Sequence, residues 1–347
     1  MKIVVVDFAA KAGGALSVLK DFAENVKKND KINDWYFILS GKFISETPNI
    51  HVIIPENIDS NLGRLKFDFI TGSKIINSFK PDVVFSMQNT TTYRVNAPVI
   101  LYLHQPLPFQ NIVNYSLLNK NERSLAIKQK LVGALIKNSL PKVANIIVQT
   151  EWMRQEVLKY ANKKESVFVI QPNIHETNKA KLENIRTNHF FYPTSDILYK
   201  NIAVVEEACK KLDNEFPLLD YAVNLTIDRS IENEKIHSVG QLSRIEVLEK
   251  LETTVLLFPS YVESFGLPLL EARQTGTFII AASTPFAHEI LNNYENVIYF
   301  DPFNAEELKG ILYKSIHEQI KLSVIKDSIV QKKDSWDEVR NIIYRSE

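Results

Sequence analysis

The chain has 347 residues, of which 45% are hydrophobic and 24% charged. These values are ordinary for a soluble globular protein, and the length favours two domains that each bury a core. Lys+Arg and Asp+Glu balance at 41 each, so no overall charge favours nucleic acid or a membrane as a partner. The single cysteine, Cys209, excludes a disulfide framework within the chain and fits a reducing cytosol. Met1 leads directly into an apolar segment and no apolar run has transmembrane length, so we expect a cytoplasmic protein.

Short apolar segments alternate with helical patterns through the first half of the chain. Ile3 to Val6 predicts a strand, followed by a loop from Asp7 to Gly14 and a helix from about Ala15 to Lys27. This alternation predicts a parallel sheet with helices on both faces. Further strands of this sheet are predicted at residues 35–39, 51–54, 83–86, 99–103 and 145–148.

Two features of this half follow predicted strands, where ligands bind in open α/β sheets. Gly13 and Gly14 stand between the first strand and its helix, although a Gly-Gly pair in a loop is usually only a turn. The G-x-G-x-x-G spacing and the Walker loop are both absent, which argues against a nicotinamide dehydrogenase. His104 comes directly after the strand at 99–103, although a lone histidine is more often structural. We find no metal-ligand spacing among the other histidines.

The segment 110–142 is basic and rich in apolar residues. It holds six lysines and arginines against Glu122 alone, a local net charge of +5. A basic amphipathic helix can lie on an anionic membrane surface. The alternative is a solvated face on a helix that packs against the sheet. Both interpretations stay open from the sequence.

A polar stretch at 175–188 predicts a linker, and a second alternating pattern follows it. Lys200 lies near a predicted helix start that follows a strand, a position suited to neutralising phosphate as a point charge, although an exposed helix lysine is the simpler alternative. A last helix is predicted to begin at Ser335 as its cap. The predicted strands of this half are residues 189–192, 221–227, 235–239, 255–258, 277–281 and 297–300.

The most specific motif runs from Val255 to Glu271. An apolar strand ends at Pro259, and a loop with Phe265-Gly-Leu-Pro268 leads into a helix. The free N–H groups of that helix start form an anion site at the carboxyl edge of the sheet. Glu263 and Glu271 bracket the loop in an E-x7-E spacing. The spacing alone is weak, since two solvated acids in an ordinary strand–turn–helix unit would give it; the combination is much stronger.

This combination resembles the retaining glycosyltransferases of family 4, which have the GT-B fold and an E-x7-E motif around Phe-Gly-Leu-Pro. The resemblance covers nearly the whole chain, most strongly from Tyr192 to Asp301. It implies two Rossmann-like α/β domains with parallel sheets that face each other across a cleft. We expect an acceptor-side domain at 1–175, a donor domain at 176–330, and a C-terminal helix at 331–347 that returns to the first domain.

The resemblance also implies roles for individual residues. His104 matches a histidine that faces the transferred sugar, and Lys200-Asn201 match a pair that binds the donor diphosphate. Glu263 would meet sugar hydroxyls, and Glu271 would bind ribose hydroxyls, because a carboxylate accepts two hydrogen bonds. The family commonly has an arginine where Thr194 and Ser195 stand, so phosphate binding would carry less charge here. The expected catalytic residues are His104, Lys200 and Glu263, and the expected donor-binding residues are Gly13, Gly14, Thr194, Ser195, Lys200, Ser264, Phe265, Gly266, Leu267 and Glu271.

The first hypothesis is therefore a retaining glycosyltransferase that moves a sugar from a nucleotide sugar to a glycan or lipid-linked glycan, in capsule, O-antigen or lipopolysaccharide synthesis. No D-x-D triplet occurs, so we expect no metal and no cofactor beyond the nucleotide sugar. We expect a cytoplasmic location with peripheral membrane contact through 110–142, and no nucleic acid. The alternatives are a non-catalytic nucleotide-sugar-binding subunit, encouraged by the missing arginine, and an epimerase or hydrolase on the same fold.

Overall fold

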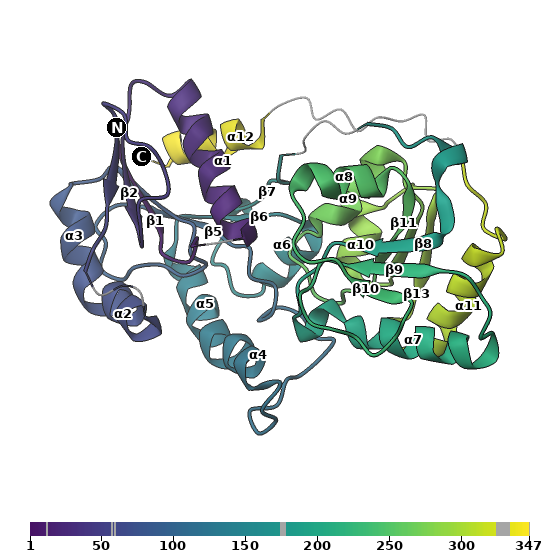
Figure 1. Cartoon of the computed structure of the whole chain (residues 1–347). Coiled ribbons are helices and arrows are strands. Elements are labelled where there is room, and N and C mark those ends of the chain that lie inside the picture. The colour runs from purple at the N-terminus through teal and green to yellow at the C-terminus, as the bar shows by residue number, and fades with distance from the viewer. Residues whose placement is uncertain (12, 57, 59, 174–177, 324–333, 347) are drawn as a thin grey trace. The chain divides into compact units, whose positions relative to one another are not determined.

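The structure, a computed structural model, describes residues 1–11, 13–56, 58, 60–173, 178–323 and 334–346. The chain divides into two compact units (Figure 1). The first comprises Met1–Asn173 and Lys332–Glu347, and the second comprises Ile174–Gln331. The boundaries predicted at 175/176 and 330/331 lie outside the described residues.

The described part of the first unit contains a sheet of seven strands in the order β3-β2-β1-β4-β5-β6-β7. All neighbouring strands pair in parallel, so their carboxyl ends share one edge. The strand order changes direction between β1 and β4, which is where open α/β sheets bind ligands. The strands are β1 (Lys2–Asp7), β2 (Asp34–Leu39), β3 (Ile50–Ile53), β4 (Val83–Ser86), β5 (Val99–Tyr102), β6 (Asn145–Val148) and β7 (Val167–Val169).

The central strands of this sheet are buried on both faces, because their apolar side chains alternate between two cores. In β1, Ile3 and Val5 join the core that contains Phe22 of helix α1, whereas Val4 and Val6 join the core on the other face. Uninterrupted apolar runs are therefore the sequence signal of these strands. The helices of the first unit are α1 (Gly13–Asn29), α2 (Asn61–Lys66), η1 (Phe67–Thr71), α3 (Gly72–Ser78), α4 (Arg123–Ile127), η2 (Lys128–Val132), α5 (Gly133–Ser139), η3 (Leu140–Lys142), α6 (Glu151–Val157) and η4 (Lys164–Ser166).

Helix α12 (Ser335–Tyr344) belongs to the first unit although it ends the chain, as predicted. Its Trp336 packs against Phe22 and Tyr102, with ring centroids 5.1 and 5.7 Å apart. Tyr344 Oη donates a hydrogen bond of 2.6 Å to the Asp30 carboxylate. Figure 1 shows α12 beside α1, and both helices cover the same face of the sheet.

The described part of the second unit contains a sheet of six parallel strands in the order β10-β9-β8-β11-β12-β13. Helices α7 and α11 pack together on one side, and α8, α9 and α10 pack on the other (Figure 1). The strand order changes direction between β8 and β11. The elements are η5 (Leu182–Asn184), β8 (Arg186–Tyr192), η6 (Leu198–Lys200), α7 (Ile202–Glu215), β9 (Ala222–Leu225), β10 (Ile236–Ser238), α8 (Arg244–Leu251), β11 (Thr254–Phe258), α9 (Leu267–Thr275), β12 (Ile279–Ala282), α10 (Pro285–Ile290), β13 (Val297–Phe300) and α11 (Ala305–Ile316).

Three local predictions differ from the structure. Gly13 and Gly14 were expected in a loop but form the first turn of α1. The cap of α12 is Asp334 rather than Ser335, because its carboxylate accepts the N–H of Trp336 at 2.9 Å. The segment 110–142 is helical only from Arg123 onward, because Gln110 and Glu122 hold the preceding residues in turns by accepting their backbone N–H groups.

Candidate functional site

The candidate site of the second unit lies where two neighbouring strands end. Lys200 ends the short helix η6 after β8, and Glu263 lies in the loop after β11. These strands pair in parallel at the reversal of strand order, so both segments emerge at the same edge of the sheet. The structure thereby brings two of the three predicted catalytic residues together.

Lys200 and Glu263 form a largely buried ion pair. Lys200 Nζ lies 2.5 Å from Glu263 Oε1, and the two side chains are 18% and 16% exposed. The buried Ser260 hydroxyl donates a second hydrogen bond of 2.8 Å to the same oxygen. The Coulomb attraction between two charges is stronger in such low-dielectric surroundings than at the surface. Removing one partner would leave the other as an uncompensated, largely buried charge. Burial and the nearby Glu263 carboxylate raise the pKa of Tyr199 to about 12, so this phenol stays protonated.

The backbone around Lys200 is held by its neighbours. Asn201 adopts the left-handed conformation at φ 59°. Its buried amide donates to Pro259 O at 3.2 Å and to Pro302 O at 2.7 Å. Tyr192 Oη donates to Lys200 O at 3.0 Å. The two residues of the predicted Lys200-Asn201 pair therefore have different roles. Asn201 fixes the turn, and Lys200 places its ammonium group beside Glu263.

Gly266 shapes the start of helix α9. It is the N-cap at φ 88°, a conformation that side chains with a Cβ rarely adopt. As a glycine it has no side chain that could cap this end of the helix. The helix start therefore keeps its positive end available, with Ser264 and Phe265 preceding it and Leu267 as its first residue. Phe265 itself is buried.

Glu271 lies inside α9 and is only 3% exposed. Its Oε1 lies 2.5 Å from Nη2 of Arg244, which begins helix α8. Neither atom makes a hydrogen bond of good geometry, so we regard the contact as an ion pair. Burial raises the pKa of Glu271, and the Arg244 charge opposes that rise. Glu271 is thus a buried carboxyl whose charged form is favoured by Arg244 and disfavoured by burial.

Thr194 and Ser195 follow β8. The backbone N–H of Thr194 donates to Thr226 Oγ1 at 2.6 Å, which in turn donates to Thr194 O at 2.8 Å. Ser195 is exposed. These two hydrogen bonds hold the segment against Thr226, the residue directly after β9.

The remaining predicted residues lie in the first unit. His104 follows β5, and Gly13 and Gly14 follow β1, at the carboxyl edge of one sheet. Burial lowers the pKa of His104 to about 4, so the imidazole is neutral near pH 7. Asn89, after β4, accepts the His104 backbone N–H at 2.8 Å. Asp7 ends β1, and burial raises the pKa of its carboxyl to about 7.

Arg244, Ser260 and Asn89 were not predicted as site residues. The capping box of Ser243 and Glu246 marks the start of α8, but nothing local indicates that Arg244 reaches Glu271. The sequence does contain a signal for Ser260 and Asn89. Both come within a few residues of the carboxyl end of a buried strand, where open α/β sheets bind ligands.

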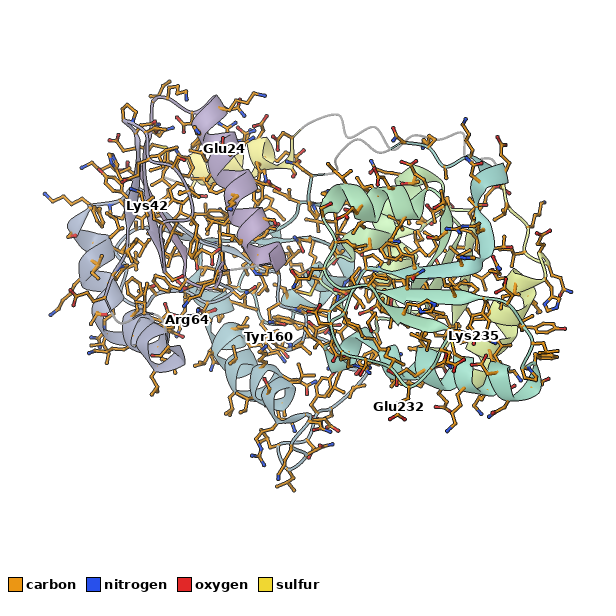
Figure 2. The ribbon with its side chains drawn as sticks, in the orientation of Figure 1. Glu24, Lys42, Arg64, Tyr160, Glu232 and Lys235 are labelled. Atoms are coloured by element: carbon orange, nitrogen blue, oxygen red, sulfur yellow. The ribbon has the colours of Figure 1, made fainter. Side chains whose placement is uncertain are left out.

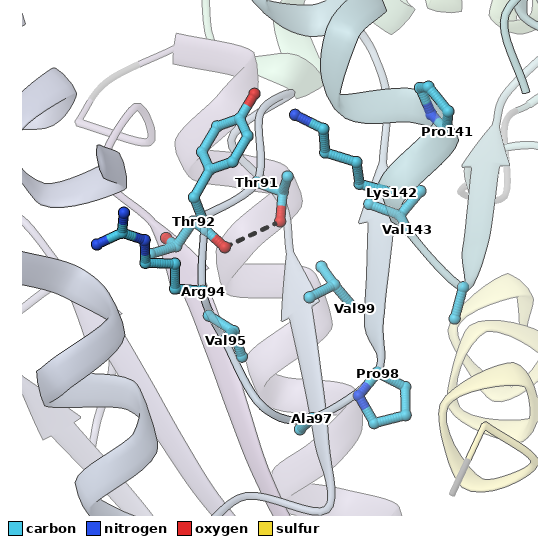
Figure 3. Close-up of a pocket in the computed structure, with 12 residues that line it drawn as sticks. Thr91, Thr92, Arg94, Val95, Ala97, Pro98, Val99, Pro141, Lys142 and Val143 are labelled. Carbon is cyan, nitrogen blue, oxygen red and sulfur yellow. Dashed lines mark hydrogen bonds between the residues drawn. The ribbon is translucent and has the colours of Figure 1, made fainter. Parts of the chain in front are cut away.

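A cavity of about 320 Å³ lies elsewhere in the first unit (Figure 3). It is lined by Arg94, Val99, Lys142 and Ala144 among others, at the amino ends of β5 and β6. Lys142 Nζ lies 4.3 Å from the Tyr93 ring centroid there. Because this is the sheet edge opposite His104, we do not assign the cavity to the candidate site.

No group of three or more His, Cys, Asp or Glu side chains within the described ranges is arranged to hold a metal ion. No described helix is both long enough and apolar enough to span a membrane.

Residues 174–329 match the family model described as "Glycosyl transferases group 1". This match falls within the second unit. A curated relative is the O-antigen chain mannosyltransferase RfbU of Salmonella typhimurium, which is 23% identical over 180 residues. That match covers 48% of this chain and half the length of the relative.

Solved structures share the architecture of the whole chain. Sucrose-phosphate synthase from Thermosynechococcus elongatus matches with a TM-score of 0.69 and 13% identity, over 99% of this chain and 95% of that one. Alr3699/HepE from Anabaena, solved with UDP and glucose, matches with a TM-score of 0.65 and 15% identity, over 100% and 95% of the two chains. The predicted GT-B fold, with a parallel sheet in each domain, is confirmed.

Proposed function

We propose that the protein is a retaining glycosyltransferase that moves a sugar from a nucleotide sugar to a glycan or lipid-linked glycan. The observation that carries this proposal is the arrangement of Lys200, Glu263 and Glu271 around one loop at the carboxyl edge of the second sheet. A cation, a helix start with glycine as its N-cap and two carboxylates suit a ligand with both phosphates and hydroxyl groups.

Each residue has a distinct task in this reaction. The bond between the sugar C1 and the donor diphosphate breaks, and a bond forms between C1 and an acceptor oxygen. Lys200 and the start of α9 stabilise the charge that develops on the leaving diphosphate. Glu263 holds sugar hydroxyls and Glu271 holds the ribose. For retention, the acceptor attacks from the leaving-group side and its proton passes to a diphosphate oxygen, so no side chain serves as nucleophile.

We propose that this reaction needs no metal ion. The support is the absence of a D-x-D triplet in the sequence, together with the cationic groups Lys200 and Arg244 beside the loop. The name of the Salmonella relative supports a place in O-antigen, capsule or lipopolysaccharide synthesis. The neighbour solved with UDP and glucose supports a nucleotide-sugar donor, whose base and sugar stay open.

The test measures binding and turnover of UDP-, GDP-, dTDP-, ADP- and CMP-sugars, with and without EDTA. Binding is measured by the shift in melting temperature and by calorimetry. A ligand that binds the native state raises its melting temperature by mass action. We expect one nucleotide class to bind, insensitive to EDTA and lost in Glu271→Ala. Binding without any turnover would instead favour a non-catalytic subunit, and turnover to an altered or free sugar would favour an epimerase or hydrolase.

We also propose, as expected from the sequence, a cytoplasmic protein that contacts a membrane peripherally through 110–142. Leu118 and Leu131 are 90% and 60% exposed, and the exposed Lys128 and Lys130 precede Leu131 in the same helical segment. Phe69 of η1 and Leu135 of α5 line the same small cavity, so these two elements are neighbours. The exposed Phe69 and Ile70 therefore add apolar side chains next to the helical segment that carries Leu131. Basic and apolar groups together suit anionic lipid.

Co-sedimentation with anionic and zwitterionic vesicles tests this contact. We expect binding to anionic vesicles that weakens in Leu118→Asp and Leu131→Asp. Leu218→Asp is the matched control, because Leu218 is 97% exposed on the second unit. Equal vesicle binding by all four proteins, including the unmutated one, would contradict the proposal.

A further inference from the structure

His104 and Asn89 make two contacts that together define the protonation of the imidazole. The backbone N–H of His104 donates to Asn89 Oδ1 at 2.8 Å. Asn89 Nδ2 lies 3.2 Å from Nε2 of the His104 ring. Both contacts join the turn after β4 to the end of β5, two neighbouring strands of the first sheet.

The first contact fixes which way the Asn89 amide faces. An amide turned by 180° would point its NH2 group at the backbone N–H of His104, placing donor against donor. The oxygen therefore faces the backbone and the NH2 group faces the imidazole. An NH2 group has no acceptor lone pair, so Nε2 of His104 must be the acceptor.

A neutral imidazole carries one proton, so the proton of His104 resides on Nδ1. This Nδ1 is shielded from solvent and has no hydrogen-bond partner within the described part of the chain. Buried polar groups normally have partners, so a shielded N–H without one is an exception that calls for a ligand oxygen or a water. The lowered pKa of His104, which burial causes, agrees with a neutral ring.

We propose that Asn89 is a positioning residue, which locks His104 in the Nδ1–H tautomer so that the imidazole meets the substrate as a hydrogen-bond donor. The statement about substrate rests on the proposed transferase function, whereas the tautomer does not. The backbone also favours asparagine at this position. Asn89 adopts the left-handed conformation at φ 67°, which asparagine tolerates better than most residues.

Asn89→Asp separates the two roles of the side chain. An aspartate can still accept the backbone N–H of His104, but it offers an acceptor in place of the NH2 donor. We expect the proton to move to Nε2, or the ring to gain a second proton and a raised pKa, because the carboxylate stabilises imidazolium. Asn89→Gly keeps the backbone conformation and removes both contacts, so we expect a mixture of tautomers.

Nitrogen-15 NMR of histidine-labelled protein without substrate reads the tautomer directly, and His104→Gln assigns the signal. We expect a protonated Nδ1 and an unprotonated Nε2 in the wild type, and a protonated Nε2 in Asn89→Asp, with or without the proton on Nδ1. Asn293→Asp is the matched control, because Asn293 is exposed, has φ 58° and belongs to the second unit. A wild-type ring protonated on Nε2, or an unchanged tautomer in Asn89→Asp, would overturn the proposal.

Turnover is measured on the same proteins. We expect kcat to fall by about tenfold or more in Asn89→Asp, with a smaller change in KM, because the donor is lost while the site stays formed. If the tautomer inverts but kcat does not change, the role toward substrate is refuted while the tautomer lock stands. If the wild type turns over no nucleotide sugar, the proposed function fails, and the NMR result still decides the role of Asn89.

Discussion

Lys200 Nζ and Glu263 Oε1 lie 2.5 Å apart, although 63 positions separate them in the chain. Each residue follows one of the two strands between which the order of the second sheet reverses. Their ion pair is more buried than the surface pair of Lys27 and Glu24, whose side chains are 39% and 67% exposed. The sheet topology therefore sets the position of the Lys200 charge. Ser260 donates an additional hydrogen bond to the same Glu263 oxygen.

The first prediction concerns Lys200→Ala. We expect turnover to fall by about 10²–10³-fold, because one preorganised cation at the leaving group is removed. We also expect a lower melting temperature, because Glu263 loses its partner in a largely buried place. Steady-state kinetics with the identified donor, alongside thermal unfolding, measures both effects.

Lys309→Ala is the matched control for Lys200→Ala. The Lys309 side chain is 15% exposed and lies 2.6 Å from Glu215, so it is a similarly covered lysine on α11, outside the candidate site. Its partner is more exposed than Glu263, at 52% against 16%. We expect a small change in stability and none in turnover. Equal loss of turnover in both variants would mean that Lys200 acts only through the fold.

The second prediction concerns Arg244→Met. Burial raises the pKa of Glu271 and Arg244 opposes this, so removing the arginine raises that pKa further. Nucleotide affinity should then fall by about tenfold, about 1.4 kcal/mol, and the loss should grow as the pH decreases and Glu271 gains a proton. Calorimetry at several pH values measures this.

Lys210→Met is the control, because Lys210 is exposed on α7. Identical nucleotide affinity of Arg244→Met and the wild type at every pH would contradict the prediction.

The third prediction concerns Asp7 and the pH dependence of stability. Its pKa of about 7 in the folded state lies above the ordinary 3.8, chiefly because of burial, while Arg64 and two backbone N–H groups oppose the rise. Arg64, labelled in Figure 2, donates from Nη2 to Phe8 O at 2.9 Å. The contribution of Asp7 to stability is thus fully present below pH 3.8 and is lost as the pH rises through 7.

Asp7→Asn keeps the side-chain oxygen that accepts the N–H groups of Ala9 and Ala10. We expect this variant to be more stable than the wild type at pH 8, by about 1–4 kcal/mol, with little difference at pH 4. Denaturant unfolding at both pH values measures it. Asp301→Asn is the control, because Asp301 also accepts a backbone N–H but is exposed to water. A constant difference across this pH range would refute the prediction.

Strands such as β4, β5 and β11 were predictable because each is a buried and mainly apolar run that suits a two-sided core. Residues 83–86, 145–148 and 297–300 have the bounds given by their sequence pattern. The cap of α12 was missed by one position because Asp334 and Ser335 are neighbours that can both cap. The predicted roles of the site residues remain predictions.

The contacts between side chains were not predictable from local pattern. Glu271 meets Arg244 from another helix, and Asn89 meets His104 from another strand. These encounters depend on which strands lie side by side, which periodicity along the chain does not encode. The sequence could indicate that polar residues gather at the carboxyl edge of a sheet, but not which of them pair.

The last prediction compares two glycines at the ends of α9. Gly266 precedes the helix at φ 88° and Gly276 follows it at φ 87°. Alanine at either position should destabilise the second unit by about 1 kcal/mol, because both need the left-handed conformation. A Cβ on Gly266 would also lie 3.3 Å from Leu269 Cδ1, so the Leu269 side chain in the first turn would have to move slightly. Only Gly266→Ala should therefore weaken nucleotide binding, because only that end presents free N–H groups to phosphate. Melting temperatures and nucleotide titrations of the two variants measure this, and equal loss of affinity in both would mean that α9 acts through stability alone.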